Sequence, residues 1–500
     1  MTEMESKMNP DGEDVEEDRE EKSDLPLRIL DMFLAYVFLA PLVVAYWRGT
    51  WTVIDTYLAP DNKEISSWAS TVIGISIIMT VTVLQELFKR CSMKMHFIAL
   101  TVLTRVYIYV VGFGAVNLWR GVWYLWDHYT SKTAISGGVS FTVGVVLLAL
   151  CRGVRNINAP PLVIVVDRNS VCFDVPTRFH ASVKVVWKYV LDSLFTVVLV
   201  GSLVVFVWRG GWTLFDSLVF PGDATKPQSA LVSYITGFII SLIYAIIQFP
   251  AEKLSECLST PKRKYGKIIF EQFYWLIGFF GPLNIWRGYW YFMDLYLLPE
   301  QPIVSCWITH VVGYIGLTLL VNSTSVLVVG CLIDGAKPMG SGVTLPINLV
   351  QDIRHDGKIF ANADEVECRS NFAHCRLNAA IAEVQFILRG KGLFFLLQYI
   401  LQSCMSFFTY QRLKGRTHQR QRGRRASINW SLVVFRMSYF TCYARVSGEN
   451  FRSACGSASE YKLAFRVLPL CLYSSNPNYF NIIQCLVVIK IDKPCTPPLS

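Results

Sequence analysis

The chain has 500 residues, of which 53% are apolar and only 17% are charged. This composition, with a mean hydropathy of +0.38, excludes an ordinary soluble globular protein and is typical of a polytopic membrane protein. The formal net charge of +10 does not indicate nucleic-acid binding, because the basic residues stand between apolar runs. The fourteen cysteines form no CxxC pattern, so we expect neither a disulfide framework nor a metal site, and no cofactor.

Eight apolar segments follow an acidic start. Residues 1–24 contain no apolar run, so we expect them to remain cytosolic and the first span to act as its own insertion signal. Crossing about 30 Å of hydrocarbon takes about 20 mostly apolar residues. The segments that meet this requirement are 25–46, 66–88, 95–118, 133–151, 185–207, 228–250, 267–285 and 304–333.

Basic residues set the direction of the spans. Cytosolic loops carry an excess of Lys and Arg, whereas acidic residues count little. The basic residues lie after the even-numbered spans, which places those ends and both termini in the cytosol. They are Lys89, Arg90 and Lys94 after span two, Arg152, Arg155, Arg168 and Arg178 after span four, and Lys253, Lys262, Arg263, Lys264 and Lys267 after span six.

A short motif, Trp-Arg-Gly-x-Trp-x-x-x-Asp, recurs at the end of every odd-numbered span. Such self-similarity indicates four related units, each a helical hairpin. The copies are Trp47, Arg48, Gly49, Trp51 and Asp55; Trp119, Arg120, Gly121, Trp123 and Asp127; Trp208, Arg209, Gly210, Trp212 and Asp216; and Trp286, Arg287, Gly288, Trp290 and Asp294.

The halves 25–151 and 184–333 also match each other. Spans three and seven both carry glycines and an asparagine, Asn117 or Asn284, ahead of the motif. Spans one and five share a carboxylate sixteen residues before it, Asp31 and Asp192. We therefore predict an all-α membrane protein built as a parallel duplication of two four-helix halves, each made of two hairpins. Parallel repeats occur in transporter folds, but they do not by themselves make a transporter.

The motif has two interpretations. A helix places both tryptophans, the arginine and the aspartate within an arc of roughly 100°. One straight helix over residues 25–58 would be about 50 Å long, so we predict a bend at the glycine. The arginine then meets lipid phosphate or the aspartate of its own copy. The copies form either an aromatic belt with snorkelling arginines or a ring of four Arg–Asp pairs that makes an outer recognition surface.

Ionisable residues also occur within the odd-numbered spans, toward the cytosolic side. Such groups either anchor or pair helices near the interface, or line a polar pathway. Arg105 lies deepest, and we expect it to meet a carboxylate on a neighbouring span. His310 and Asn322 are expected to join helices. The full set of charges is Asp31, Arg105, Lys188, Asp192 and Glu271.

The remaining segments are expected in the cytosol. Residues 152–183 contain an alternating stretch, 162–175, that predicts a β-hairpin, and residues 334–384 contain a second, with a turn at 355–357. Residues 385–500 show no clean periodicity and are predicted as an irregular basic tail. Its basic block, 412–425, favours attraction to anionic lipid, and phosphorylation of Ser427 would weaken that attachment.

Eight spans with this motif at all four outer turns resemble the fuseless family of invertebrate membrane proteins, over residues 25–335. The resemblance implies an eight-pass protein of the presynaptic plasma membrane that supports voltage-gated calcium channels, and thereby transmitter release and synapse development. It implies lipid and channel or presynaptic scaffold proteins as partners, and no nucleic acid. The duplication and intramembrane charges leave a transporter of a lipid-like or amphipathic solute as the alternative. No nucleophile, base and orienting group occur together, so we expect no enzyme.

Overall fold

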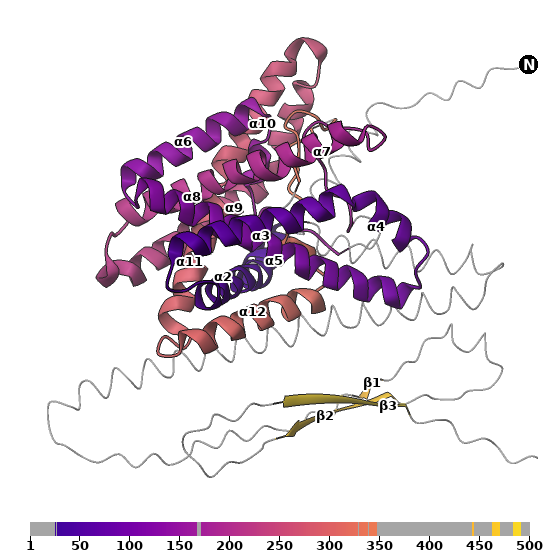
Figure 1. The fold of residues 1–500 in the computed structure, drawn as a ribbon. Coiled ribbons are helices and arrows are strands. Elements are labelled where there is room, and N and C mark those ends of the chain that lie inside the picture. Colours follow the sequence, from indigo (N-terminus) through magenta and orange to yellow (C-terminus); the bar gives the residue numbers. More distant parts are fainter. Residues whose placement is uncertain are drawn as a thin grey trace, which may run out of the picture. The chain divides into compact units, whose positions relative to one another are not determined.

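The computed structural model describes two compact units, Met1–Phe408 and Thr409–Ser500, each treated by itself below. The described part of the first unit is a bundle of helices (Figure 1). The described residues are 26, 28–167, 172–328, 330–338, 340–347 and three strands at 443–444, 463–470 and 484–491.

Seven helical stretches of the bundle are long and apolar enough to cross a membrane, and an eighth apolar helix, α6, has 17 residues. The elements, where η marks a 3-10 or π helix, are η1 (Ala35–Leu39), α2 (Ala40–Tyr57), α3 (Lys63–Val83), α4 (Gln85–Ser92), α5 (Phe97–Thr130), α6 (Ala134–Leu150), η2 (Val154–Ile157), α7 (Val186–Leu194), η3 (Phe195–Val200), α8 (Gly201–Leu218), η4 (Asp223–Thr225), α9 (Lys226–Cys257), η5 (Pro261–Arg263), α10 (Lys264–Gly278), α11 (Phe280–Tyr296), α12 (Pro302–Leu319) and η6 (Ser323–Val326).

The helices form a closed ring of two layers. The four motif-bearing helices, α2, α5, α8 and α11, contact one another in sequence, and α11 returns to α2. Around them, each outer helix packs against the motif helix of the next hairpin: α3 on α5, α6 on α8, and α9 on α11. The last outer helix, α12, packs back on α2, as Figure 1 shows. The ring therefore closes between the first and the last helix of the bundle.

Small residues allow this close packing. A Cβ atom added to Gly49 would lie 2.3 Å from the backbone nitrogen of His310 on α12. One added to Gly74 of α3 would lie 2.3 Å from the backbone nitrogen of Leu118 on α5. Close backbone approach at small residues is a common way for membrane helices to associate. Every outer helix carries such residues four apart: Ser66, Ser70 and Gly74; Ser136, Ser140 and Gly144; Ser229, Ser233 and Gly237; and Ser305, Thr309 and Gly313.

The predicted bend at the motif glycine is wrong. The helix α2 continues through Gly49 to Tyr57, and α5 runs from Phe97 to Thr130 without a break. The glycine instead removes the side chain at the crossing with an outer helix. The irregular turns lie eight or more residues earlier, in the π-helical segments η1 and η3 that precede the first and third motifs.

The outward faces of the outer helices are apolar and exposed. Hydrocarbon accepts such side chains, provided that the backbone is hydrogen-bonded within the helix. This face therefore suits contact with lipid tails. Examples are Trp68 and Val72 on α3, Ile135 and Val139 on α6, Ile235 and Ile239 on α9, and Trp307 and Val311 on α12.

The β-hairpin predicted at 162–175 is not confirmed, because none of its described residues lies in a strand. The N–H of Ile164 donates to the carbonyl of Pro346, and that of Asp167 donates to the carbonyl of Val321. This stretch thus pairs with the chain that follows α12. The turn predicted at 355–357 lies outside the described residues.

The second unit contains a three-stranded antiparallel sheet, a feature that the sequence analysis did not foresee for this tail. Its order is β1 (Tyr443–Ala444), β2 (Leu463–Leu470) and β3 (Gln484–Ile491). β2 and β3 pair from Leu463 opposite Ile491 to Leu470 opposite Gln484. The basic block at 412–425 and Ser427 lie outside the described residues.

Candidate functional site: an outer ring and two inner turns

The four motif arginines form a closed ring of ion pairs. Each guanidinium binds the aspartate of the preceding motif helix, at nitrogen–oxygen distances of 2.7–2.9 Å. The expectation that an arginine meets the aspartate of its own copy is wrong, because seven helical residues separate the two by about 10 Å along the axis. The pairs are Arg120–Asp55, Arg209–Asp127, Arg287–Asp216 and Arg48–Asp294.

Each arginine also binds the outer helix that packs beside it. Arg120 donates to the hydroxyls of Ser70 and Ser66, both at 2.7 Å. Arg287 donates to Ser233 and Ser229 of α9 in the same way. The planar guanidinium suits this task, since its donors point in fixed, divergent directions. Each arginine thus joins two motif helices and one outer helix.

The tryptophans fill the axis of the ring in two layers. Within each layer the neighbouring indoles meet edge to face, an arrangement that aromatic rings favour. Adjacent ring centroids are 5.0–5.6 Å apart in the inner layer and 5.7–6.0 Å apart in the outer one. The inner tetrad is Trp47, Trp119, Trp208 and Trp286, and the outer tetrad is Trp51, Trp123, Trp212 and Trp290.

The aromatic-belt interpretation of these residues is therefore wrong. The four tryptophans of the inner tetrad are buried, with exposed fractions of 1–5%. They face one another across the bundle axis, whereas a belt would place them at its perimeter. The arginines do not snorkel either, since their side chains are at most 5% exposed.

The outer ring is not fully fourfold. The indole N–H of Trp51 donates to the hydroxyl of Tyr124, which donates in turn to Asp55. Trp212, Tyr291 and Asp216 repeat this chain at the opposite junction. At the two other junctions the position of the tyrosine is occupied by Thr52 and Thr213. Alternate junctions thus resemble each other.

Two turns close the axis from the inner side. The indole N–H of Trp47 donates to the carbonyl of Val326 in η6, at 3.1 Å. The indole N–H of Trp208 donates to the carbonyl of Ile157 in η2, at 2.8 Å. Both turns thus lie directly against the inner tetrad. The side chains of Ile157 and Val326 are fully buried there.

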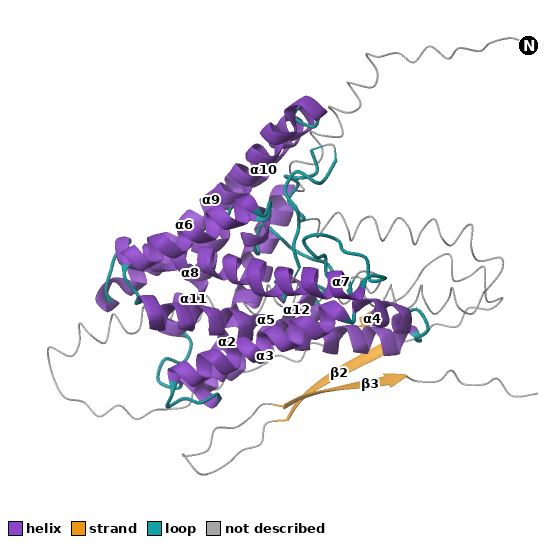
Figure 2. Cartoon of the chain, turned by 45° about the horizontal axis from the view of Figure 1, so that its top comes forward, coloured by secondary structure: helices purple, strands orange, loops and turns teal. Residues whose placement is uncertain are grey.

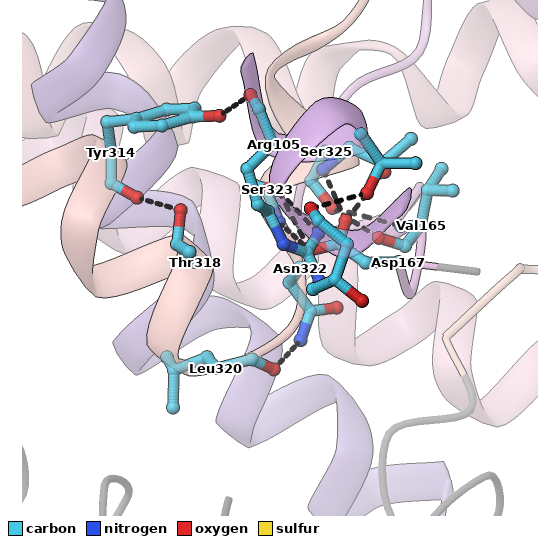
Figure 3. A network of polar contacts seen from close by, with 12 residues as sticks. Arg105, Val165, Asp167, Tyr314, Thr318, Leu320, Asn322, Ser323 and Ser325 are labelled. Carbon is cyan, nitrogen blue, oxygen red and sulfur yellow. Dashed lines mark hydrogen bonds and ion pairs between the residues drawn. The ribbon is translucent and has the colours of Figure 1, made fainter. Parts of the chain in front are cut away.

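One carboxylate, Asp167, holds η6 in place (Figure 3). It accepts hydrogen bonds from the backbone N–H and the hydroxyl of both Ser323 and Thr324. It also forms an ion pair with Arg105, which donates to the Ser323 hydroxyl as well. The carboxylate partner expected for Arg105 therefore exists, but it belongs to the loop after α6 and not to a neighbouring span.

A second carboxylate, Asp334, holds η2 in the corresponding way. Its two oxygens accept the N–H groups of Val154 at 2.8 Å and Arg155 at 3.1 Å. Asp167 follows η2 in the chain but binds η6, and Asp334 follows η6 but binds η2. The sequence analysis missed this exchange. A usable signal was present, because each aspartate ends an apolar run, Val165-Val166-Asp167 or Leu332-Ile333-Asp334.

Residues 26–327 match the sequence model of the family described as Fuseless, which spans every helix from η1 to η6. The chain belongs to the Fuseless family. No curated protein and no solved structure matches it. The outer ring and the two inner turns of this Fuseless protein all lie within the matched residues, apart from Asp334.

The other intramembrane charges of the Fuseless chain lie near the inner loops. Asp192 accepts the Thr177 hydroxyl and the N–H groups of Phe179 and Ala181, and so fixes the loop before α7. Glu271 accepts from the Ser255 hydroxyl and the Gly335 N–H. Asp31 is buried, whereas Lys188 is exposed and lies over the ring of Trp187. These contacts favour helix and loop pairing over a polar pathway.

His310 joins three helices, as expected. Its Nδ1 lies 2.8 Å from the Thr50 hydroxyl of α2, and its Nε2 lies 3.0 Å from the Tyr109 hydroxyl of α5. Because Thr50 already donates to the Tyr46 carbonyl, it accepts from Nδ1–H, and Tyr109 donates to Nε2. A neutral imidazole satisfies both bonds. Asn322 donates to the Leu320 carbonyl beside η6.

Proposed function

We propose that this protein is a non-enzymatic, multi-pass membrane protein that organises or supports voltage-gated calcium channels at presynaptic terminals, with effects on transmitter release and synapse development. Membership of the Fuseless family supports a presynaptic membrane role. The proposed partners are membrane lipid and the channel or a presynaptic scaffold protein, with anionic lipid at the basic tail.

The observation that carries the proposal is the filled axis of the bundle. Two tryptophan tetrads occupy it, and η2 and η6 lie against the inner one. A ring of ion pairs, each with a buried guanidinium, joins all four motif helices around it. A channel or transporter needs an open path along its axis and helices that can rearrange. A filled and cross-linked axis suits a rigid scaffold that presents its ends to partners.

We further propose that the chain crosses the membrane eight times as two parallel halves, with both termini in the cytosol. The helix α6 supplies the eighth crossing, since its 17 residues span about 25 Å. The free cysteines Cys91 and Cys257 are exposed at the ends of α4 and α9 that this topology assigns to the cytosol.

Labelling of those two thiols tests the topology. A membrane-impermeant maleimide, followed by mass spectrometry of the peptides, should modify Cys91 and Cys257 only after the plasma membrane is permeabilised. Cys172 is buried and provides the matched control that stays unlabelled. Labelling of Cys91 or Cys257 in intact cells would overturn the proposed orientation.

Presynaptic calcium entry tests the function. In neurons that lack this chain we expect reduced calcium entry and displaced channels, both restored by the full-length chain. A chain that ends at Phe408 lacks the separate second unit and tests whether that unit contributes to docking. Normal calcium entry with normal channel placement in neurons lacking the chain would reject the organiser.

A transporter of a lipid-like or amphipathic solute is the second candidate. The observation in its favour is the buried polar cluster of Arg105, Asp167 and Ser323 at the inner end of the bundle. Uptake of such a solute into proteoliposomes, lost in Arg105→Gln, would reverse the ranking.

A further inference from the structure

The two inner turns are held by equivalent carboxylates that differ in their surroundings. Asp334 binds the N–H groups at the start of η2, and Asp167 binds those at the start of η6. Both aspartates are almost fully buried, with exposed fractions of 1% for Asp334 and 2% for the side chain of Asp167. The two aspartates thus hold their turns by the same kind of hydrogen bond but have different charged neighbours.

Asp167 has strong partners for its negative charge. The Arg105 guanidinium pairs with it, and the hydroxyls of Ser323 and Thr324 add to the two N–H groups. An opposite charge and four hydrogen-bond donors thus surround this carboxylate. The negative charge of Asp167 is therefore compensated within its own contacts at η6.

Asp334 has weaker partners. Among the described residues its carboxylate forms no ion pair, because Arg152 binds the backbone carbonyl of Asp334 and Arg155 binds the carbonyls of Gly342 and Thr344. Glu271 of α10 lies nearby and adds a like charge. The charged groups around it, from the η2 segment, the loop before α7, α10 and its own loop, are Arg152, Arg155, Arg178, Lys267, Glu271 and Lys337.

We propose that Asp334 is a protonation-sensitive latch that holds η2 against the inner tryptophan tetrad, whereas Asp167 is a fixed latch on η6. The step is the transfer of one proton between water and the Asp334 carboxylate. When η2 is released, the Trp208 indole N–H loses the Ile157 carbonyl and the inner face of the bundle changes shape. The proposal adds a regulated inner surface to the protein and does not depend on its partner.

The direction of the effect follows from the burial of the carboxylate. Burial raises the pKa of Asp334 to about 6 while η2 is in place, and this effect outweighs the lowering by its N–H bonds and by Gln272. The nearby Glu271 adds a smaller rise. In a released state that is open to water, its pKa returns to about 3.9. A group whose pKa is raised in one state stabilises that state below the raised pKa and loses the effect as the pH rises through it. The latch therefore tightens in acid and loosens above about pH 6.

Hydrogen exchange on the full chain in lipid nanodiscs tests the proposal. After correction for intrinsic exchange, the protection of residues 153–157 should fall about tenfold from pH 5 to pH 8, as the pKa values above require. Protection of residues 323–326 should not change in that range. Asp334→Asn keeps the shape of the protonated carboxyl and should make the protection of η2 independent of pH.

Two further variants keep the test decisive. Glu271→Gln removes the neighbouring charge and should move the midpoint at η2 to lower pH, with no effect at η6. Asp167→Asn should reduce protection at η6 at every pH and leave the pH response of η2 intact. If wild type and Asp334→Asn show the same pH profile at η2, or if η6 responds as η2 does, the latch is rejected.

Discussion

The outer and inner ends of the bundle are built on different symmetries. At the outer end, four near-identical copies of one motif meet in a ring, and each repeats the same ion pair and the same indole contacts. At the inner end two turns of the described chain, η2 and η6, lie against the inner tetrad, and each is held by the aspartate that follows the other turn. In Figure 2 the loops of the described chain are drawn in teal, and a group of them lies beside α7 and α10. The comparison teaches that the outer end repeats one structural joint four times, with a twofold variation at its tyrosines, whereas the inner end has twofold order alone.

The largest expected effect is the loss of one outer ion pair. Arg209→Ala removes a fully buried guanidinium and leaves Asp127, whose side chain is 8% exposed, without its arginine. Breaking a buried pair from one side costs about 3–5 kcal/mol. The variant should lower the free energy of unfolding by that amount in a detergent titration. Arg287→Ala leaves Asp216, whose side chain is 41% exposed, so its loss should be smaller.

Arg209→Lys serves as the control for this prediction. Lysine keeps the charge but has no planar fork to reach Asp127, Ser136 and the Ser131 carbonyl at once. We expect about half of the loss caused by Arg209→Ala. A lysine variant with the stability of the wild type would show that charge alone holds the ring.

A smaller effect is expected from filling one close helix crossing. A Cβ atom added to Gly210 of α8 would lie 2.4 Å from the backbone nitrogen of Phe141 on α6, so Gly210→Ala forces the two helices apart. Overpacking of this kind costs about 1–3 kcal/mol. Gly138 of α6 has nothing within 4 Å of an added Cβ, so Gly138→Ala is the matched control and should be neutral or slightly stabilising. Equal effects of the two variants would contradict the packing described here.

The smallest effect concerns the twofold element of the outer ring. Tyr124→Phe and Tyr291→Phe each remove one hydroxyl between an indole and an aspartate. Each should cost about 1 kcal/mol, the usual size of a hydrogen bond, including one within a membrane bundle. The same detergent titration should give two matching values. Markedly unequal values would show that the halves are not energetically equivalent.

The recurrence of the motif predicted much of the fold. Four copies, each at the end of an apolar span, indicated four hairpins, and each copy does lie on a helix of the ring. The partner of each arginine was not predictable in the same way, because it depends on which helices are neighbours in space. Arg48 illustrates the difficulty, since its aspartate lies 246 residues away. The sequence did contain a sign of the packing that we did not use, namely the serines and glycines four apart on each outer helix.

The inner end was predicted less well for another reason. The stretch 162–175 alternates as a strand does, but the N–H groups of Ile164 and Asp167 bind the chain that follows α12. Local alternation reports which side chains are buried and does not report the backbone partner. The same limit applies to Arg105, where the expected carboxylate was found on a loop.

The closure of the ring has a consequence for the synthesis of the protein. The partners of Arg48 are Asp294, Ser305 and Thr309, which lie 246, 257 and 261 residues later in the chain. During translation the first hairpin thus enters the membrane with a charged guanidinium whose partners do not yet exist. At about 5–20 residues per second, this interval lasts on the order of ten seconds or more. Until α12 emerges, the Arg48 guanidinium therefore has to be solvated by groups other than its final partners, such as water or lipid headgroups at the interface.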